Sequence, residues 1–138
     1  MGRRIRYEIE GVTAVAELYD DLSPRMAEAV WSALPLSVTL VHVKWSGFAG
    51  FFQPGEGRWN AVTELEYPVC SIYPGTLVAR PGGSELLIAY GPSEYRWAIG
   101  VDYVTPVAKT VENRPALIDV LARMHSEGNK PLTIRREA

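Results

Sequence analysis

A histidine in an apolar segment is the first residue whose chemistry stands out. His42 lies within residues 36–45, where most of its neighbours are Val, Leu and Thr. Imidazole changes charge near neutral pH, so a pocket-facing His42 would act as an acid, a base or a hydrogen-bond donor. The alternative is a histidine at the edge of the core, satisfied by a backbone carbonyl. The sequence leaves both interpretations open.

Two further residues carry reactive side chains. His125 follows Met124 near the end of an expected helix, where a solvated imidazole favours the negative helix end. Cys70 has apolar neighbours and is expected to be a small buried side chain. His42 and His125 do not have the spacing of a metal motif. We therefore expect no metal and no cofactor.

Other catalytic patterns are missing. Ser46 precedes Gly47 without the elbow motif of a serine hydrolase, and no acidic residue is placed by sequence to orient His42. Gly47 and Gly50 lack the third glycine of a phosphate loop. The sequence leaves the catalytic residues unknown.

Aromatic side chains gather in one Gly- and Pro-rich region. Concave binding sites combine such rings with a few polar groups, although the same rings also pack barrels and subunit interfaces. The polar candidates are Arg58, Glu64, Tyr90 and Arg96. The aromatic set consists of Trp45, Phe48, Phe51, Phe52, Trp59, Tyr67 and Tyr73.

Composition bounds the class of protein. The chain has 138 residues, 47% of them hydrophobic, and a net charge of -2. This predicts one globular domain over residues 1–138, and the charge argues against nucleic-acid binding. The single cysteine excludes an internal disulfide. No leader or membrane-spanning stretch is visible, so a cytoplasmic location without a membrane partner is expected.

Short strands dominate the predicted elements. Alternating apolar residues predict a hairpin of residues 3–10 and 12–19 that turns near Glu10-Gly11. Residues 36–45 are expected to form a strand covered on both faces. Turn residues then separate further strands, with a hairpin turn at residues 81–83. These strands are expected around residues 69–72, 76–80, 85–90, 103–111 and 132–135.

Two helices interrupt the strands. Ser23, as the N-cap, and Pro24 begin the first helix, and Pro35 ends it. A second helix opens at residues 113–115. Each helix has one apolar stripe at helical spacing. The stripes are Ala27, Val30, Trp31 and Leu34, and then Leu117, Val120, Leu121 and Met124. Many short strands with only two helices predict a mainly β fold, a closed barrel of about eight strands capped by the helices.

The order of these elements resembles the cyclophilin-like barrel. Residues 23–34 are similar to the first cyclophilin helix, and the whole chain resembles an uncharacterised family of small bacterial and archaeal proteins assigned to this fold. The residues that carry this likeness are 33–36, 42–47, 67–68, 73–75, 90–92 and 127–128. The resemblance implies a fold and carries over no activity.

Prolyl isomerisation is the activity that a cyclophilin would suggest. The resemblance implies an arginine in the strand after the first helix, but the matching position is Val43, and Lys44 faces the other way in a strand. Gln53 matches the amide of the following motif, and Phe51 or Phe52 could form the hydrophobic floor. The missing guanidinium leaves enzyme activity uncertain.

Three hypotheses follow. The first is a domain that binds a small molecule or peptide in an aromatic-lined cleft, without isomerase activity. Its candidate site residues are His42, Trp45, Phe51, Phe52, Tyr90 and Arg96. The second is a divergent peptidyl-prolyl isomerase in which Lys44 or Arg58 replaces the arginine. The third is a structural subunit that forms homo-oligomers.

Overall fold

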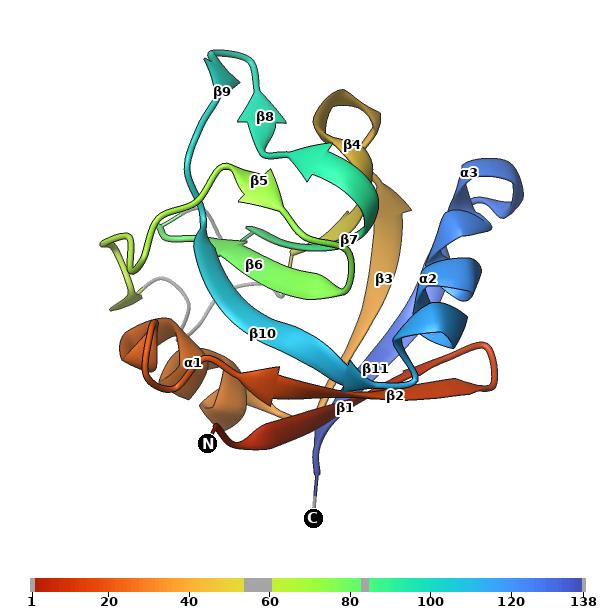
Figure 1. Cartoon of the computed structure of the whole chain (residues 1–138), viewed down its shortest axis with the longest axis horizontal. Coiled ribbons are helices and arrows are strands. Elements are labelled where there is room, and N and C mark those ends of the chain that lie inside the picture. The colour runs from red at the N-terminus through yellow and green to blue at the C-terminus, as the bar shows by residue number, and fades with distance from the viewer. Residues whose placement is uncertain (1, 54–60, 83–84, 138) are drawn as a thin grey trace.

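Eight antiparallel strands pair around a closed ring in the computed structural model, which describes residues 2–53, 61–82 and 85–137 (Figure 1). The pairing of β4 with β7 closes the ring. In ring order the strands are β4 (Gly47–Phe52), β3 (Leu36–His42), β11 (Lys130–Arg136), β1 (Arg4–Ile9), β2 (Val12–Leu18), β10 (Thr105–Glu112), β6 (Thr76–Arg80) and β7 (Glu85–Glu94). The predicted mainly β barrel of about eight strands is confirmed.

Three very short strands lie outside the ring. β5 (Ser71–Ile72) pairs with the end of β7. β8 (Arg96–Trp97) and β9 (Gly100–Val101) pair only with each other and form a small ribbon at one side of the barrel (Figure 1). The ribbon was not predicted, because two-residue strands are too short to show alternation.

The hairpin between β1 and β2 turns where it was predicted. Ile9 is paired with Val12, and both residues between them have positive φ, 45° at Glu10 and 79° at Gly11. Two central residues of positive φ are typical of a type I′ turn, whose twist matches that of the strands. Glycine adopts this conformation without a steric penalty, so Gly11 suits its position.

Two helices cover the barrel interior, as predicted. α1 (Pro24–Ala33) and α2 (Arg114–Ala122) lie on opposite sides of the view in Figure 1. α2 is followed after Arg123 by the single turn α3 (Met124–Glu127). Both apolar stripes pack into the main core with the inward side chains of the strands. Among the described residues, no helix is long and apolar enough to cross a membrane.

The start of α1 differs from the prediction. Ser23 occupies the N-cap position, but its hydroxyl donates to the carbonyl of Pro106 at 2.6 Å and makes no capping bond. The carboxylate of Glu66 accepts instead from the backbone N–H groups of Arg25 and Met26, at 3.1 and 2.9 Å. An acidic group at a helix N-terminus satisfies free amides and the helix dipole. The predicted cap by Ser23 was therefore wrong.

Two expectations about burial were also wrong. Ser37 and Thr39 of β3 are exposed, so this strand is not covered on both faces. Their polar side chains alternate outward and need no cover. Cys70 is half-buried rather than buried. A second apolar cluster lies outside the barrel, against β4, β6 and β7; its buried members are Val43, Ala49, Ile72, Val78, Leu87, Ala89, Tyr95 and Val104.

Candidate functional site

His42 and Tyr90 meet at one end of the barrel. Leu40 points into the main core, and His42 follows on the same face two residues later, at the end of β3. Nε2 of His42 lies 2.5 Å from the hydroxyl of Tyr90, which β7 supplies. The two rings meet edge to face. Nδ1 of His42 is buried and has no hydrogen-bond partner among the described residues.

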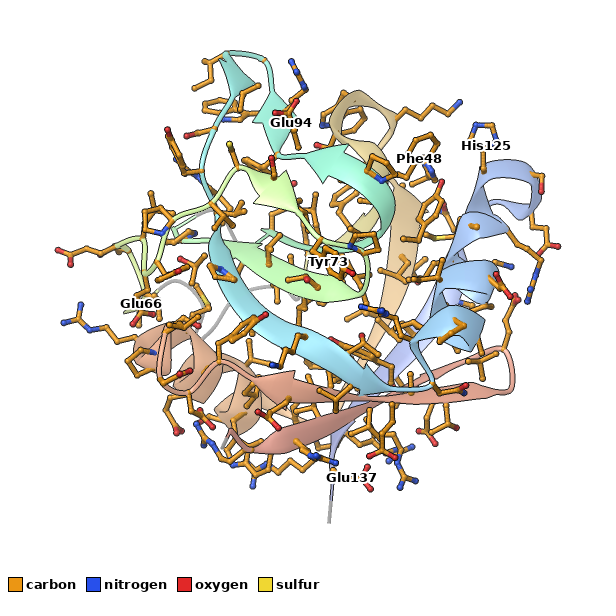
Figure 2. The ribbon with its side chains drawn as sticks, viewed as in Figure 1. Phe48, Glu66, Tyr73, Glu94, His125 and Glu137 are labelled. Atoms are coloured by element: carbon orange, nitrogen blue, oxygen red, sulfur yellow. The ribbon has the colours of Figure 1, made fainter. Side chains whose placement is uncertain are left out.

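α3 brings the second histidine to the same place. The rings of His42 and His125 are 5.5 Å apart between centroids, at an angle of 80°. His125 is exposed, as predicted, but its contact with His42 was missed, because only the barrel and its capping helix bring the two together. A pocket of about 220 Å³ opens beside them, lined by His42, Lys44, Gly47, Phe48 and His125. Figure 2 labels Phe48 and His125 at this end of the barrel.

The charges around His42 favour its neutral form. Burial lowers the pKa of His42, and the nearby His125 and Lys44 lower it further. Burial also raises the pKa of the Tyr90 phenol, which stays protonated at neutral pH. The five residues that line this pocket include no carboxylate. A neutral imidazole therefore faces two basic side chains with no acid among these lining residues.

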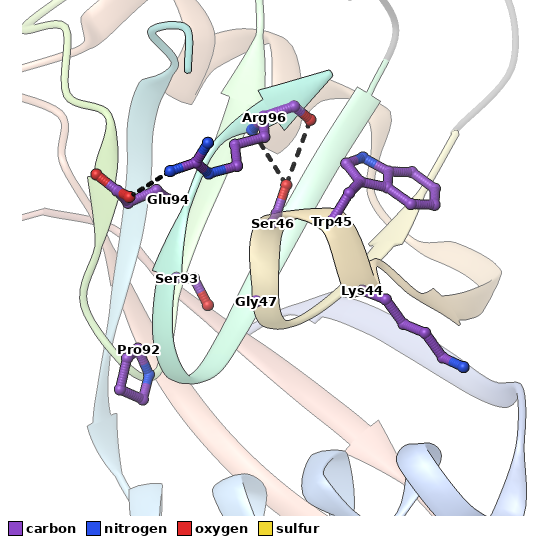
Figure 3. Close-up of a pocket in the computed structure, with 8 residues that line it drawn as sticks. All are labelled: Lys44, Trp45, Ser46, Gly47, Pro92, Ser93, Glu94 and Arg96. Carbon is purple, nitrogen blue, oxygen red and sulfur yellow. Dashed lines mark hydrogen bonds and ion pairs between the residues drawn. The ribbon is translucent and has the colours of Figure 1, made fainter. Parts of the chain in front are cut away.

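Arg96 lines a different pocket, of about 330 Å³. The short 3-10 helix η1 (Lys44–Ser46) forms one wall, and the hydroxyl of Ser46 accepts from the backbone N–H of Arg96 at 3.1 Å. The guanidinium of Arg96 pairs with Glu94 at 3.1 Å. Figure 3 shows Arg96 turned toward Glu94 and the Trp45 indole on the opposite side of η1. Lys44 and Gly47 line both this pocket and the one beside His42.

Trp45 reaches an apolar pocket that sequence reasoning missed. This pocket, of about 430 Å³, is lined by Trp45, Glu85, Trp97 and Ala98. A second one of about 340 Å³ shares Glu85 and Trp97 with it and adds the ring of Tyr95. Burial raises the pKa of the Glu85 carboxyl. Trp97 belongs to the β8–β9 ribbon, and its indole N–H donates to Asp102 at 2.8 Å.

Phe51 and Phe52 both line a further pocket, of about 430 Å³, but their rings differ in burial. Phe51 is half-buried against the outer cluster, with its ring 6.4 Å from that of Trp45. Phe52 points the other way, into the barrel, where only 2% of it is exposed. Tyr67 and Tyr73 are exposed. Arg58 and Trp59 lie outside the described residues. The six predicted site residues thus line several neighbouring hollows and the core, rather than a single cleft.

The barrel and its two capping helices have the arrangement of the cyclophilin-like fold. Residues 5–57 match a family described as "Protein of unknown function (DUF3830)". The predicted likeness to an uncharacterised family of this fold is confirmed. The curated proteins contain no match to the chain.

Several solved structures share the fold. A structure of McbB in complex with tryptophan is 23% identical, with a TM-score of 0.75 over 97% of this chain, although the chain spans only 45% of that protein. A hypothetical protein from Archaeoglobus fulgidus is 16% identical, with a TM-score of 0.65, 99% of this chain and 95% of that one being covered. A cyclophilin-type peptidyl-prolyl isomerase from Cryptosporidium parvum, studied with the dipeptide Ala-Pro, is 14% identical, with a TM-score of 0.64 and 99% of both chains covered. At these identities the likeness extends to the fold alone.

Proposed function

We propose that this protein binds a small molecule or peptide side chain that has a flat apolar body and a basic nitrogen, between Trp45 and Trp97. The observation that carries the proposal is the pocket of about 430 Å³ in which these two indoles and the Glu85 carboxyl meet. Trp45 is 57% and Trp97 46% exposed, which is unusual for the largest apolar side chain. Ligand pockets of about 300–1,000 Å³ with aromatic walls and few polar groups are typical of small-molecule sites.

The chemistry of the walls selects the ligand. An indole face attracts a cation through the negative face of its π-system, and tryptophan does so most strongly. The raised pKa of Glu85 means that its ionised form lacks full solvation. A ligand ammonium beside Glu85 would bring a positive charge to the carboxylate and stabilise its ionised form. A ligand with both an aromatic body and an amine therefore fits better than a neutral or acidic one.

The structure of McbB with its ligand gives independent support to the proposal. That protein, whose fold this chain matches, was solved with tryptophan, a ligand that contains an aromatic ring, an amine and a carboxylate. The likeness covers less than half of McbB, so it supports a class of ligand and no reaction.

Tryptamine is a suitable probe. Of the four tryptophans, Trp45 and Trp97 line the pocket. Trp31, which belongs to α1, instead packs against the guanidinium groups of Arg3 and Arg136. In a two-dimensional NMR spectrum of the ¹⁵N-labelled protein, tryptamine should shift the indole signals of Trp45 and Trp97 and leave that of Trp31 in place. Shifts spread evenly over all indoles, or none at all, would contradict the proposal.

Two comparisons separate the amine from the ring. 3-Methylindole lacks the ammonium and should bind more weakly than tryptamine. Glu85→Gln should reduce that difference, leaving the part due to the indoles, whereas Glu64→Gln, at an exposed carboxylate, should leave it unchanged. Equal binding of tryptamine to the wild type and to Glu85→Gln would reject the role of the carboxyl.

The proposal includes no prolyl isomerase activity. Val43, which stands where the resemblance implies the arginine, is fully buried in the outer cluster. Lys44 is exposed on η1 and lines two pockets that also share Gly47. A protease-coupled proline assay should give the uncatalysed rate. A faster rate that Lys44→Ala abolishes would restore the isomerase hypothesis.

Self-association stays a prediction. The β8–β9 ribbon and the residues after it expose Trp97, Ile99, Val101 and Tyr103. Exposed apolar groups of this kind occur at interfaces between subunits as well as in ligand sites. Light scattering at several concentrations checks this alternative, because a mass that stays at 15.3 kDa rejects it.

A further inference from the structure

The pocket beside His42 has a composition unlike that of the Trp45–Trp97 pocket. Its walls are two imidazoles, one ammonium, the edge of Phe48 and the backbone of Gly47. Four of these residues come from the consecutive elements β3, η1 and β4, and α3 supplies His125 from a distant part of the sequence. All three ionisable groups in the walls are basic, so the pocket attracts negative charge.

We propose that this pocket binds a small carboxylate with an apolar body, and that His42 takes up a proton from water as the anion enters. The carboxylate would lie among His42, His125 and Lys44, with its apolar part against the ring of Phe48. The site is distinct from the pocket of the proposed function, and the two ligands differ in charge.

The surroundings of His42 explain why its protonated form needs an anionic ligand. The titratable groups that face it are Tyr90 from β7, His125 from α3 and Lys44 from η1. β4 offers none, because residues 47–52 contain no ionisable side chain. Glu127, the carboxylate of α3, is engaged by Lys130 at 2.5 Å and by Arg123 at 3.5 Å. A protonated His42 would therefore lack a counter-charge among the described groups until a ligand supplies one.

The hydrogen bond between His42 and Tyr90 couples the protonation of His42 to the binding of the ligand. In the neutral form of His42, Nε2 can accept a hydrogen bond from the Tyr90 hydroxyl; protonation of Nε2 reverses this bond, so that Nε2 donates to the phenol oxygen. The Tyr90 O–H is then free to donate elsewhere. Tyr90 also meets Phe48, one of the residues that line the pocket, edge to face with centroids 5.8 Å apart. A carboxylate oxygen would accept from the released hydroxyl.

Proton uptake makes the affinity depend on pH. A ligand that prefers the protonated site raises the pKa of His42. Between the pKa of free His42 and its pKa in the complex, the affinity falls by up to about tenfold for each pH unit. The pKa of free His42 is already depressed, which widens the pH range over which this coupling acts.

The chain contains only two histidines, which makes the test direct. With ¹³C-labelled histidine, benzoate should shift the Cε1–H signals of both imidazoles, and His125→Gln assigns them. Benzoate should bind several-fold more tightly at about pH 6 than at about pH 8, and a saturating concentration should move the midpoint of His42 upward. Benzamide, which has the same shape without the charge, should bind much more weakly.

Substitution of Lys44 tests the pocket without disturbing the core. Lys44→Gln, at an exposed position, should weaken benzoate binding several-fold, whereas Lys109→Gln, at an exposed position on β10, should leave it unchanged. Three results would overturn the proposal: no imidazole shift at tens of millimolar benzoate, equal binding of benzamide, or an unchanged midpoint of His42 at saturation. Tryptamine binding through Trp45 and Trp97 is read from indole signals, so each proposal can fail independently.

Discussion

The phenol of Tyr90 and the imidazole of His42 lie 2.5 Å apart at the end of the barrel, although 48 residues separate them in the chain. β4 brings them together, because it pairs with β3 on one side and with β7 on the other. This contact is the only polar partner of His42 among the described residues, since Nδ1 is buried without one. The structure therefore favours a pocket-edge histidine held by a phenol over one satisfied by a backbone carbonyl.

Tyr90→Phe tests the weight of this contact. The variant keeps the ring and removes the hydroxyl, which leaves Nε2 of His42 without its partner. We expect the free energy of unfolding to fall by about 1–3 kcal/mol, the usual cost of an unsatisfied buried polar group. Urea unfolding measures it, and Tyr73→Phe, at an exposed phenol, should change little. Equal stability of Tyr90→Phe and the wild type would show that water replaces the phenol.

The protonation of His42 should destabilise the fold. Its pKa is lower in the folded protein than the ordinary value of 6.5, so below that pH the unfolded chain binds the proton first. The free energy of unfolding should therefore begin to decrease as the pH falls through about 6.5, and stop decreasing from this cause below the folded pKa. The carboxylates of lowered pKa, such as Asp20 and Glu137, act only in more acidic solution.

Urea unfolding of the wild type and of His42→Gln across this range measures the effect. The slope of stability against pH should be smaller in the variant. The imidazole signal of His42 should titrate below 6.5 in the folded protein. A midpoint at or above that value would contradict the prediction.

The periodic parts of the fold could be predicted from the sequence. Leu117, Val120 and Leu121 repeat at helical spacing and are fully buried on α2. The hairpin of β1 and β2 follows in the same way from alternation with a glycine turn. In both cases the information lies within a few consecutive residues, and burial of one face decides the conformation.

Features that depend on distant contacts could not be predicted. Ser23 has the side chain of an N-cap, but the carbonyl of Pro106, 83 residues later, competes for its hydroxyl. Arg96 stands between two aromatic residues in the sequence, which made it a candidate polar group of the cleft. In the structure it pairs with Glu94 and lines a different pocket from His42. Glu85 and Trp97 have no local signal at all. They meet only because the ribbon after β7 folds back beside the start of that strand.

Phe51 and Phe52 were both predicted to line the ligand cleft, and the structure shows that they differ in burial. Phe52 is enclosed in the barrel with 2% exposure, whereas Phe51 is half-buried on the outer face. Phe52→Ala should lower the free energy of unfolding by about 3–5 kcal/mol, the typical cost of removing a core phenylalanine. Phe51→Ala should cost clearly less. Thermal or urea unfolding measures both, and similar losses would mean that Phe51 also belongs to a closed core.

Glu85 is expected to have opposite effects on the stability of the fold and on the binding of the proposed ligand. Burial raises its pKa, so its charged form is less stable in the fold than in the unfolded chain. This penalty is present above the folded pKa and disappears below the ordinary value of 4.5. Glu85→Gln should therefore raise the free energy of unfolding modestly at neutral pH, and the gain should vanish in acid, where the carboxyl of the wild type is already neutral.

Urea unfolding of Glu85→Gln and of the exposed control Glu64→Gln measures that gain at neutral and acidic pH. A variant that is more stable and yet binds tryptamine less well would mean that a carboxylate which weakens the fold is useful to the ligand. A loss of stability in Glu85→Gln would instead mean that the charge is already well compensated in the free protein. In that case an amine would gain little from it, and the selectivity of the Trp45–Trp97 pocket would rest on the indoles alone.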